Sequence, residues 1–253
     1  MAARIIGAPY ATGVRGVGLG RGPLELLGER DDVTWLGEPG DDVVEAGRVF
    51  ALNAALAGLV SEARAGGATP IVVAGNCSTC TAQVGHADGI VWLDTHADFN
   101  TPDTTASGFL DGMALSFATG EGYDHLRAAI PGFRAVAPDR VVLVGVRDVD
   151  PLEQRRIDVR GVRSATAAAV EPPAERVYLH VDLDVLDTSV GRANQFARAG
   201  GLQVADVLGV IERVAARATI TGAAITAWDP SYDDGGGIRD AAGTILAALE
   251  AAL

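Results

Sequence analysis

Short β-branched apolar runs alternate with alanine-rich segments of helical period along the chain, and this alternation constrains the fold most. The expected strands are Ala3–Ala8, Asp32–Leu36, Pro70–Ala74, Gly89–Leu93, Arg140–Val146, Val177–Val181 and Ile220–Ala227. The expected helices are Val44–Ala65, Ser78–His86, Asp111–Thr119, Pro151–Ile157, Val204–Ala218 and Ile238–Leu253. This order predicts a single α/β domain over residues 1–253, with helices on both faces of a mostly parallel sheet.

The charge balance excludes several classes of partner. The 253 residues carry a formal net charge of −13, with 33 Asp and Glu against 20 Arg and no Lys. Nucleic acid and anionic membranes bind positive patches, so we expect neither as a partner. No apolar run reaches the roughly 18 residues that a membrane span needs. The first residues lack the pattern of a cleaved signal peptide, and we therefore expect a cytoplasmic protein.

Metal-competent side chains follow the strand expected at Gly89–Leu93. Asp94, His96 and Asp98 stand at every second position. In extended backbone, residues at this spacing point to one face. Two carboxylates and an imidazole therefore converge at the end of a buried strand.

The same pattern recurs at the end of a second strand, where His180, Asp182 and Asp184 alternate. In parallel α/β sheets, ligands bind beyond the carboxyl ends of the strands. Two such strand ends can build a carboxylate-rich site for two divalent metal ions, and a site of this kind activates water.

These motifs carry a resemblance to a known family. The segment 94–98 is similar to the D-A-H-x-D motif of the ureohydrolases (arginases, agmatinases and relatives), and the segment 180–187 resembles their S-x-D-x-D-x-x-D-P motif. The likeness runs nearly end to end. It implies a three-layer α/β/α arginase-like fold, two Mn²⁺ ions, hydrolysis of a C–N bond in a guanidine-type substrate, and a homo-oligomer of three or six subunits.

The resemblance also implies roles for single residues. The implied metal ligands are Cys77, Asp94, His96, Asp98, Asp182 and Asp184. Asp94 and Asp182 bridge or flank both ions in this interpretation. Asp98 is in addition a candidate catalytic residue, which passes a proton to the leaving amine.

Cys77 departs from the family pattern. The family usually reads G-G-D-H-S, with a metal-binding histidine, where this chain reads Gly75-Asn76-Cys77-Ser78. A thiolate is softer than imidazole and suits manganese less well, so the site either favours another metal or holds one ion weakly. Two readings stay open: Cys77 is a ligand, or it is a small buried thiol that binds nothing.

Two further candidate catalytic residues depart from the family. Asp111 stands where the family commonly has a proton-shuttling histidine, so we expect it to hydrogen-bond the substrate or to cap a helix. His180 stands where many relatives have serine. It is either a proton carrier or outer partner of the metal site, or a hydrogen-bonded structural histidine.

The positions that match the amino-acid end of an arginase site are retained. Asn100 and Ser107 match residues that hold an α-carboxylate. Asp150 matches the residue that holds the α-amino group, with Glu153 assisting through water. Agmatine lacks the carboxylate, so we expect an L-amino acid.

The guanidine end is altered. Ala227 stands where arginases have the glutamate that pairs with the guanidinium, and Phe196 stands where they have threonine. A bulkier or less basic head group fits such a pocket better. The sequence therefore predicts hydrolysis of N-hydroxy-L-arginine to hydroxyurea and L-ornithine, as in relatives from antibiotic biosynthesis. The alternatives are an ordinary arginase or guanidino-acid hydrolase, and an inactive structural or regulatory protein.

Overall fold

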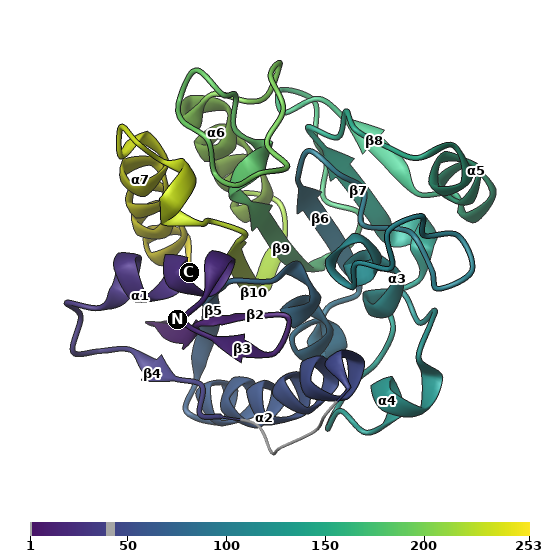
Figure 1. The fold of residues 1–253 in the computed structure, drawn as a ribbon, viewed down its shortest axis with the longest axis horizontal. Helices are drawn as coiled ribbons and strands as arrows, with labels where there is room; N and C mark the ends of the chain where they lie inside the picture. The colour runs from purple at the N-terminus through teal and green to yellow at the C-terminus, as the bar shows by residue number, and fades with distance from the viewer. Residues whose placement is uncertain (1, 39–43) are drawn as a thin grey trace.

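A parallel sheet of eight strands forms the centre of the computed structural model, which describes residues 2–38 and 44–253 (Figure 1). The strand order is β4-β1-β5-β10-β9-β6-β7-β8. The strands are β1 Ala2–Ala8, β4 Thr34–Trp35, β5 Ala68–Ala74, β6 Gly89–Leu93, β7 Val141–Val144, β8 Arg163–Ala165, β9 Arg176–Asp182 and β10 Thr219–Thr226. A separate antiparallel hairpin joins β2 Tyr10–Ala11 and β3 Val14–Arg15.

Helices cover both faces of the sheet, which confirms the predicted three-layer α/β/α fold (Figure 1). One apolar core lies between the sheet and the helices α1 Arg21–Leu27, α6 Val204–Ala215 and α7 Gly237–Ala252. The opposite face packs on α2 Glu45–Ala65, α3 Ala114–Ala118 and α5 Pro151–Arg160. A further short helix is α4 Asp124–Ala128. No helix in the described ranges combines the length and apolar character needed to cross a bilayer.

Most predicted elements are present, but two expected helices differ. The segment predicted as a helix at Ser78–His86 forms two short 3-10 helices, η2 Cys77–Ala82 and η3 Val84–His86. Hydroxyls of Thr79 and Thr81 donate to carbonyls three residues back, and such bonds compete with α-helical pairing. The predicted helix Asp111–Thr119 is a 3-10 turn, η4 Asp111–Met113, followed by α3.

The limits of other elements also shift. The strand expected at Asp32–Leu36 is reduced to the two residues of β4 at the edge of the sheet. The helix expected at Pro151–Ile157 continues to Arg160 and ends at Gly161, whose φ of 72° is the left-handed geometry that glycine adopts without strain. The hairpin β2–β3, α1, α4 and β8 were not predicted from the sequence.

Candidate metal centre

The parallel register brings the two acidic motifs together. Leu93 pairs with Val181 across β6 and β9, so Asp94 and Asp182 leave adjacent strands side by side. Thr226 at the end of β10 pairs with Asp182 from the other side. The strand ends therefore place the side chains at one edge of the sheet, as the sequence predicted.

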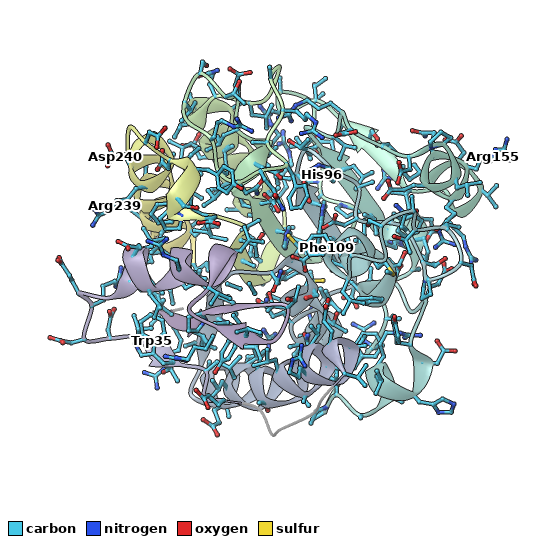
Figure 2. All side chains as sticks on the ribbon, in the orientation of Figure 1. Trp35, His96, Phe109, Arg155, Arg239 and Asp240 are labelled. Atoms are coloured by element: carbon cyan, nitrogen blue, oxygen red, sulfur yellow. The ribbon has the colours of Figure 1, made fainter. Side chains whose placement is uncertain are left out.

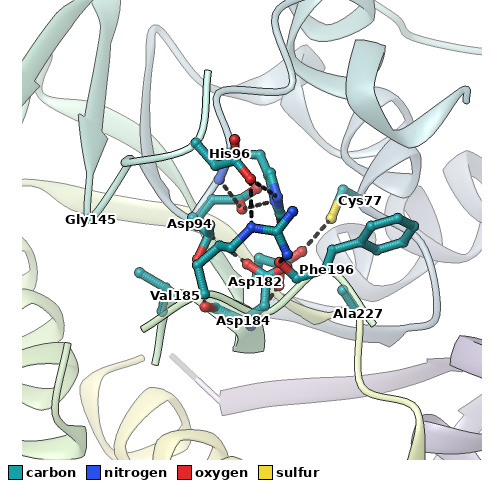
Figure 3. A network of polar contacts seen from close by, with 12 residues as sticks. Cys77, Asp94, His96, Gly145, Asp182, Asp184, Val185, Phe196 and Ala227 are labelled. Carbon is teal, nitrogen blue, oxygen red and sulfur yellow. Dashed lines mark hydrogen bonds and ion pairs between the residues drawn. The ribbon is translucent and has the colours of Figure 1, made fainter. Parts of the chain in front are cut away.

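His96, Asp94 and Asp184 form one group of metal-competent atoms, all within 4.8 Å of one another. His96 Nδ1 lies 3.3 Å from Asp94 Oδ1 and 3.4 Å from Asp184 Oδ2 (Figure 3). Burial alone lowers the pKa of His96, but the hydrogen bond and charge of Asp94, with the charges of Asp184 and Asp148, raise it to about 9.

Cys77, Asp94, His180 and Asp182 form a second group, again with ligand atoms within 4.8 Å of one another. All four are buried. The Cys77 thiol donates to Asp182 Oδ2 over 2.9 Å (Figure 3). Burial, and then the charge of Asp182, raises the pKa of this thiol well above its usual value.

Asp98 belongs to neither group, although it lines the same cavity as Asp182 and Asp184. Its φ of 49° turns the chain away after the metal motif, and its carbonyl accepts the amides of Leu115 and Ser116 at the start of α3. Burial, followed by the charges of Asp94 and Asp111, raises the pKa of Asp98.

The donor groups fit a pair of divalent cations. Burial, and then repulsion from Asp184, raises the pKa of Asp94 to about 7, and the pKa of Asp182 rises for the same reasons. Buried carboxylates at this density require positive charge for their ionised forms. The carboxylate oxygens are hard donors that suit divalent cations, whereas the thiol of Cys77 is a softer donor.

A cavity of about 400 Å³ opens above these groups. Its apolar wall includes Leu19, Phe109, Phe196 and Ala227. The rings of Phe109 and Phe196 lie 5.6 Å apart, and His96 meets Phe196 edge-on at 6.3 Å. His96 and Phe109 both lie near the middle of the molecule, whereas Arg155 and Arg239 project at its periphery (Figure 2).

The predicted substrate residues line this cavity together. Asn100 donates to Asp150 Oδ2 at 3.5 Å, and Ser107, at the exposed mouth, accepts the Phe109 amide. Glu153 accepts the amides of Phe99 at 2.7 Å and Asp150 at 3.3 Å. Its carboxylate is thus occupied in holding the start of α5.

Asp111 lines the cavity and supports the Cys77 segment. Its carboxylate accepts the Ser78 amide at 3.1 Å and the Asn76 side-chain amide. Asp111 therefore satisfies an amide in the first turn of the neighbouring 3-10 helix η2. It does not cap its own helix η4, where Leu110 holds the N-cap position. Burial raises the pKa of Asp111 to about 6 against the opposing effect of these hydrogen bonds.

His180 is fully buried and is not among the residues that line the cavity. Its ring stacks on Trp92 with centroids 3.6 Å apart and planes 5° from parallel. Nδ1 lies 3.2 Å from Tyr178 Oη, and Nε2 lies 3.2 Å from Thr226 Oγ1. Burial lowers the pKa of His180 to about 3, so the imidazole is neutral.

Sequence reasoning missed several residues that line the cavity, among them Asn194 and Arg198. Asn194 donates to Asp184 Oδ2 and to the Ala227 carbonyl, and it accepts the Phe196 amide at 2.8 Å. Arg198 pairs with Asp148 at 2.8 Å beside the cavity. Both lie in a loop without periodicity, so no motif in the sequence signals them.

Carboxylates and imidazoles gathered at the strand ends of a three-layer α/β/α fold are the kind of donor set with which metal-dependent hydrolases bind divalent ions. The model of the Arginase family matches residues 2–251, and the chain therefore belongs to the arginase family.

Similar arginases agree with this assignment. Arginase-1 of Oryctolagus cuniculus is 30% identical over 273 residues, which cover 90% of this chain and 84% of the relative. Mitochondrial arginase-2 of Bos taurus is 28% identical over 83% of this chain and 72% of its own. The crystal structure of arginase from Bacillus subtilis superposes with a TM-score of 0.82 at 24% identity, covering 99% and 98% of the two chains.

Proposed function

We propose that this chain is a dinuclear manganese hydrolase that cleaves a C–N bond of a guanidine-type L-amino acid. We propose N-hydroxy-L-arginine as the substrate, with hydroxyurea and L-ornithine as products. The apolar inner wall of the cavity is the observation that carries this proposal. Ala227 contributes a methyl side chain to this wall, and Phe196 contributes its ring.

The proposed head group of the substrate follows from the absence of a carboxylate at position 227. A guanidinium buried against this wall has no carboxylate partner at Ala227, and truncating one partner of such a pair costs about 2–5 kcal/mol. The N-hydroxyguanidine group is less basic and enters the cavity as a neutral group at a smaller cost. Its extra oxygen also occupies space that a longer side chain at position 227 would fill.

The amino-acid end follows from the polar side of the cavity. Asp150 offers an acceptor for an α-amino group, and the side-chain amide of Asn100 offers a donor for an α-carboxylate. Arg198 is half-exposed and pairs with Asp148. No other arginine lines the cavity in the described part of the chain, and Arg198 supplies positive charge for an α-carboxylate. These groups favour an L-amino acid over agmatine.

The chemistry needs water, a positioned substrate and a proton carrier. When bound, a pair of divalent ions activates water as a nucleophile near neutral pH. Asp98 lies in the same cavity as Asp182 and Asp184, so its carboxyl group is placed to carry a proton beside the substrate. Addition of water to the guanidine carbon and rupture of its bond to the side-chain nitrogen require a proton on the leaving amine, and Asp98 delivers it.

Turnover of a small panel of substrates tests the proposal. The Mn²⁺-loaded protein is incubated with N-hydroxy-L-arginine, L-arginine, agmatine and 4-guanidinobutyrate, and products and bound metal are measured. We expect two ions per chain and the highest kcat/KM for N-hydroxy-L-arginine. A preference for arginine refutes the interpretation of Ala227 and Phe196. One ion and no turnover on any compound supports an inactive family member instead.

A matched pair of variants isolates the charge at position 227. Ala227→Glu restores a carboxylate facing the head group, whereas Ala227→Gln adds the same bulk without charge. Both keep a Cβ at a backbone φ of 65°, so their strain is alike. We expect only the glutamate variant to gain kcat/KM for arginine relative to N-hydroxy-L-arginine. On the resemblance alone, we also propose a trimer or hexamer, which analytical ultracentrifugation measures.

A further inference from the structure

We propose that His180 is a metal ligand, which supplies from β9 the imidazole that position 77 lacks. With Cys77, Asp94 and Asp182 it forms the binding site of the ion that lies deeper in the protein. This inference rests on the two-metal site of the proposed function. It replaces the role of proton carrier, because His180 lies beneath the cavity and does not line it.

The register of three strands places these groups together. Trp92 pairs with His180 across β6 and β9, and Ala224 of β10 pairs with His180 from the other side. Asp94 and Asp182 follow two residues later on the same face. The imidazole is therefore directly below the paired carboxylates and extends towards them.

The distances suit coordination of a single ion. The ligand atoms of all four residues lie within 4.8 Å of one another. Atoms bound to one ion at roughly 2.0–2.3 Å cannot be farther apart than about 4.6 Å. Small rotations of buried side chains thus suffice. The cluster combines two carboxylates, one imidazole and one thiol, and on binding the thiol proton of Cys77 leaves to solvent.

The surroundings of His180 orient its ring as metal-binding histidines are oriented. Tyr178 Oη lies 3.2 Å from Nδ1, and in the tautomer that carries its proton on Nδ1 the phenol oxygen accepts that proton and Nε2 keeps its lone pair for a metal ion. Stacking on Trp92 fixes the plane of the ring. Thr226 Oγ1 lies 3.2 Å from His180 Nε2 and 3.3 Å from Cys77 Sγ, so its hydroxyl can turn to the sulfur when the nitrogen binds metal.

Nuclear magnetic resonance of the full chain tests this assignment without altering the site. The protein contains four histidines, so ¹⁵N labelling of histidine gives few ring signals. After loading with two ¹¹³Cd²⁺ ions, we expect ¹⁵N–¹¹³Cd coupling on His96 and His180 and on neither other ring. His86→Gln and His125→Gln assign the remaining signals, and proximity to Trp92 identifies His180.

The outcomes separate this inference from the proposed function. Coupling on His96 alone shows that His180 is structural and overturns the inference, while a metal site remains. Absence of coupling on both rings overturns the inference and the two-metal site together. Coupling on both rings without turnover of any guanidine compound supports the ligand assignment and refutes the proposed activity.

Substitutions at positions 77 and 180 give a second test. We expect His180→Ser to weaken binding of one Mn²⁺ ion by more than the roughly 10–100-fold typical of losing an outer partner. Tyr178→Phe is the control for that outer-partner effect. The double variant Cys77→His with His180→Ser is expected to regain affinity, as measured by calorimetry. Unchanged Mn²⁺ affinity in His180→Ser overturns the inference.

Discussion

Replacing Asp94 by asparagine in the metal-free protein tests how the buried carboxylates affect stability. The pKa of Asp94 is raised from 3.8 to about 7, first by burial and then by the charge of Asp184. A carboxyl group whose pKa rises on folding stabilises the folded state below its unfolded pKa. That contribution is lost as the pH rises through the folded pKa.

The magnitude follows from the shift. Each pKa unit corresponds to about 1.4 kcal/mol. Between about pH 5 and pH 7 the unfolded chain has Asp94 ionised while the folded chain keeps most of its proton. The native protein therefore loses about 2 kcal/mol of unfolding free energy over this range through Asp94, and the Asp94→Asn variant does not.

Urea unfolding in the presence of a chelator measures this effect at the two pH values. The hydrogen bonds that Asp94 accepts from Trp92 Nε1 and the His96 amide add an offset that is independent of pH. The readout is therefore the change in the difference between the two proteins, not the difference itself. A difference that stays constant with pH, or that moves against the variant as the pH rises, refutes the reasoning.

Added Mn²⁺ is expected to stabilise the native protein more than the Asp94→Asn variant. Mn²⁺ at 100 times its dissociation constant stabilises the native protein by about 2.7 kcal/mol. The asparagine variant loses a ligand of both donor groups and gains less. If Mn²⁺ raises the unfolding free energy of both proteins equally, Asp94 does not bind metal.

Other variants probe the cavity. Asp98→Asn is expected to abolish turnover while the near-ultraviolet circular dichroism is unchanged; retained activity removes Asp98 from the mechanism. Arg198→Gln is expected to raise KM for the amino-acid substrate about tenfold, a loss of about 1.4 kcal/mol, with kcat retained. Arg155→Gln, an equal charge change on exposed α5, serves as its control, and equal effects of both variants contradict a role for Arg198.

The strands that carry the site were predictable because continuous apolar runs in the sequence indicate that these strands are buried. β5, β6, β9 and β10 lie in the interior of the sheet and have helices on both faces, and β5 and β6 are almost entirely apolar until they end. The change from Leu93 to Asp94 marks such an end. Local spacing then fixes which acidic side chains share a face.

Long-range neighbours were not predictable in this way. Thr226 and Trp92 lie inside strands and carry no motif, and their contact with His180 depends on the order of the strands in space. Asn194 and Arg198 belong to an irregular loop, which Asp187 closes by accepting the amides of Gly200 and Gly201. Such contacts follow from tertiary packing, which leaves no periodic signal along the chain.

The position of β10 has a consequence for assembly of the protein during synthesis. β10, at residues 219–226, inserts between β5 and β9, which carry Cys77 and Asp182 at or just beyond their ends. A nascent chain that has not yet emerged past residue 226 therefore cannot bring the thiol and this carboxylate together. Capture of a metal ion by the complete set of ligands is thus deferred until the chain has left the ribosome past residue 226.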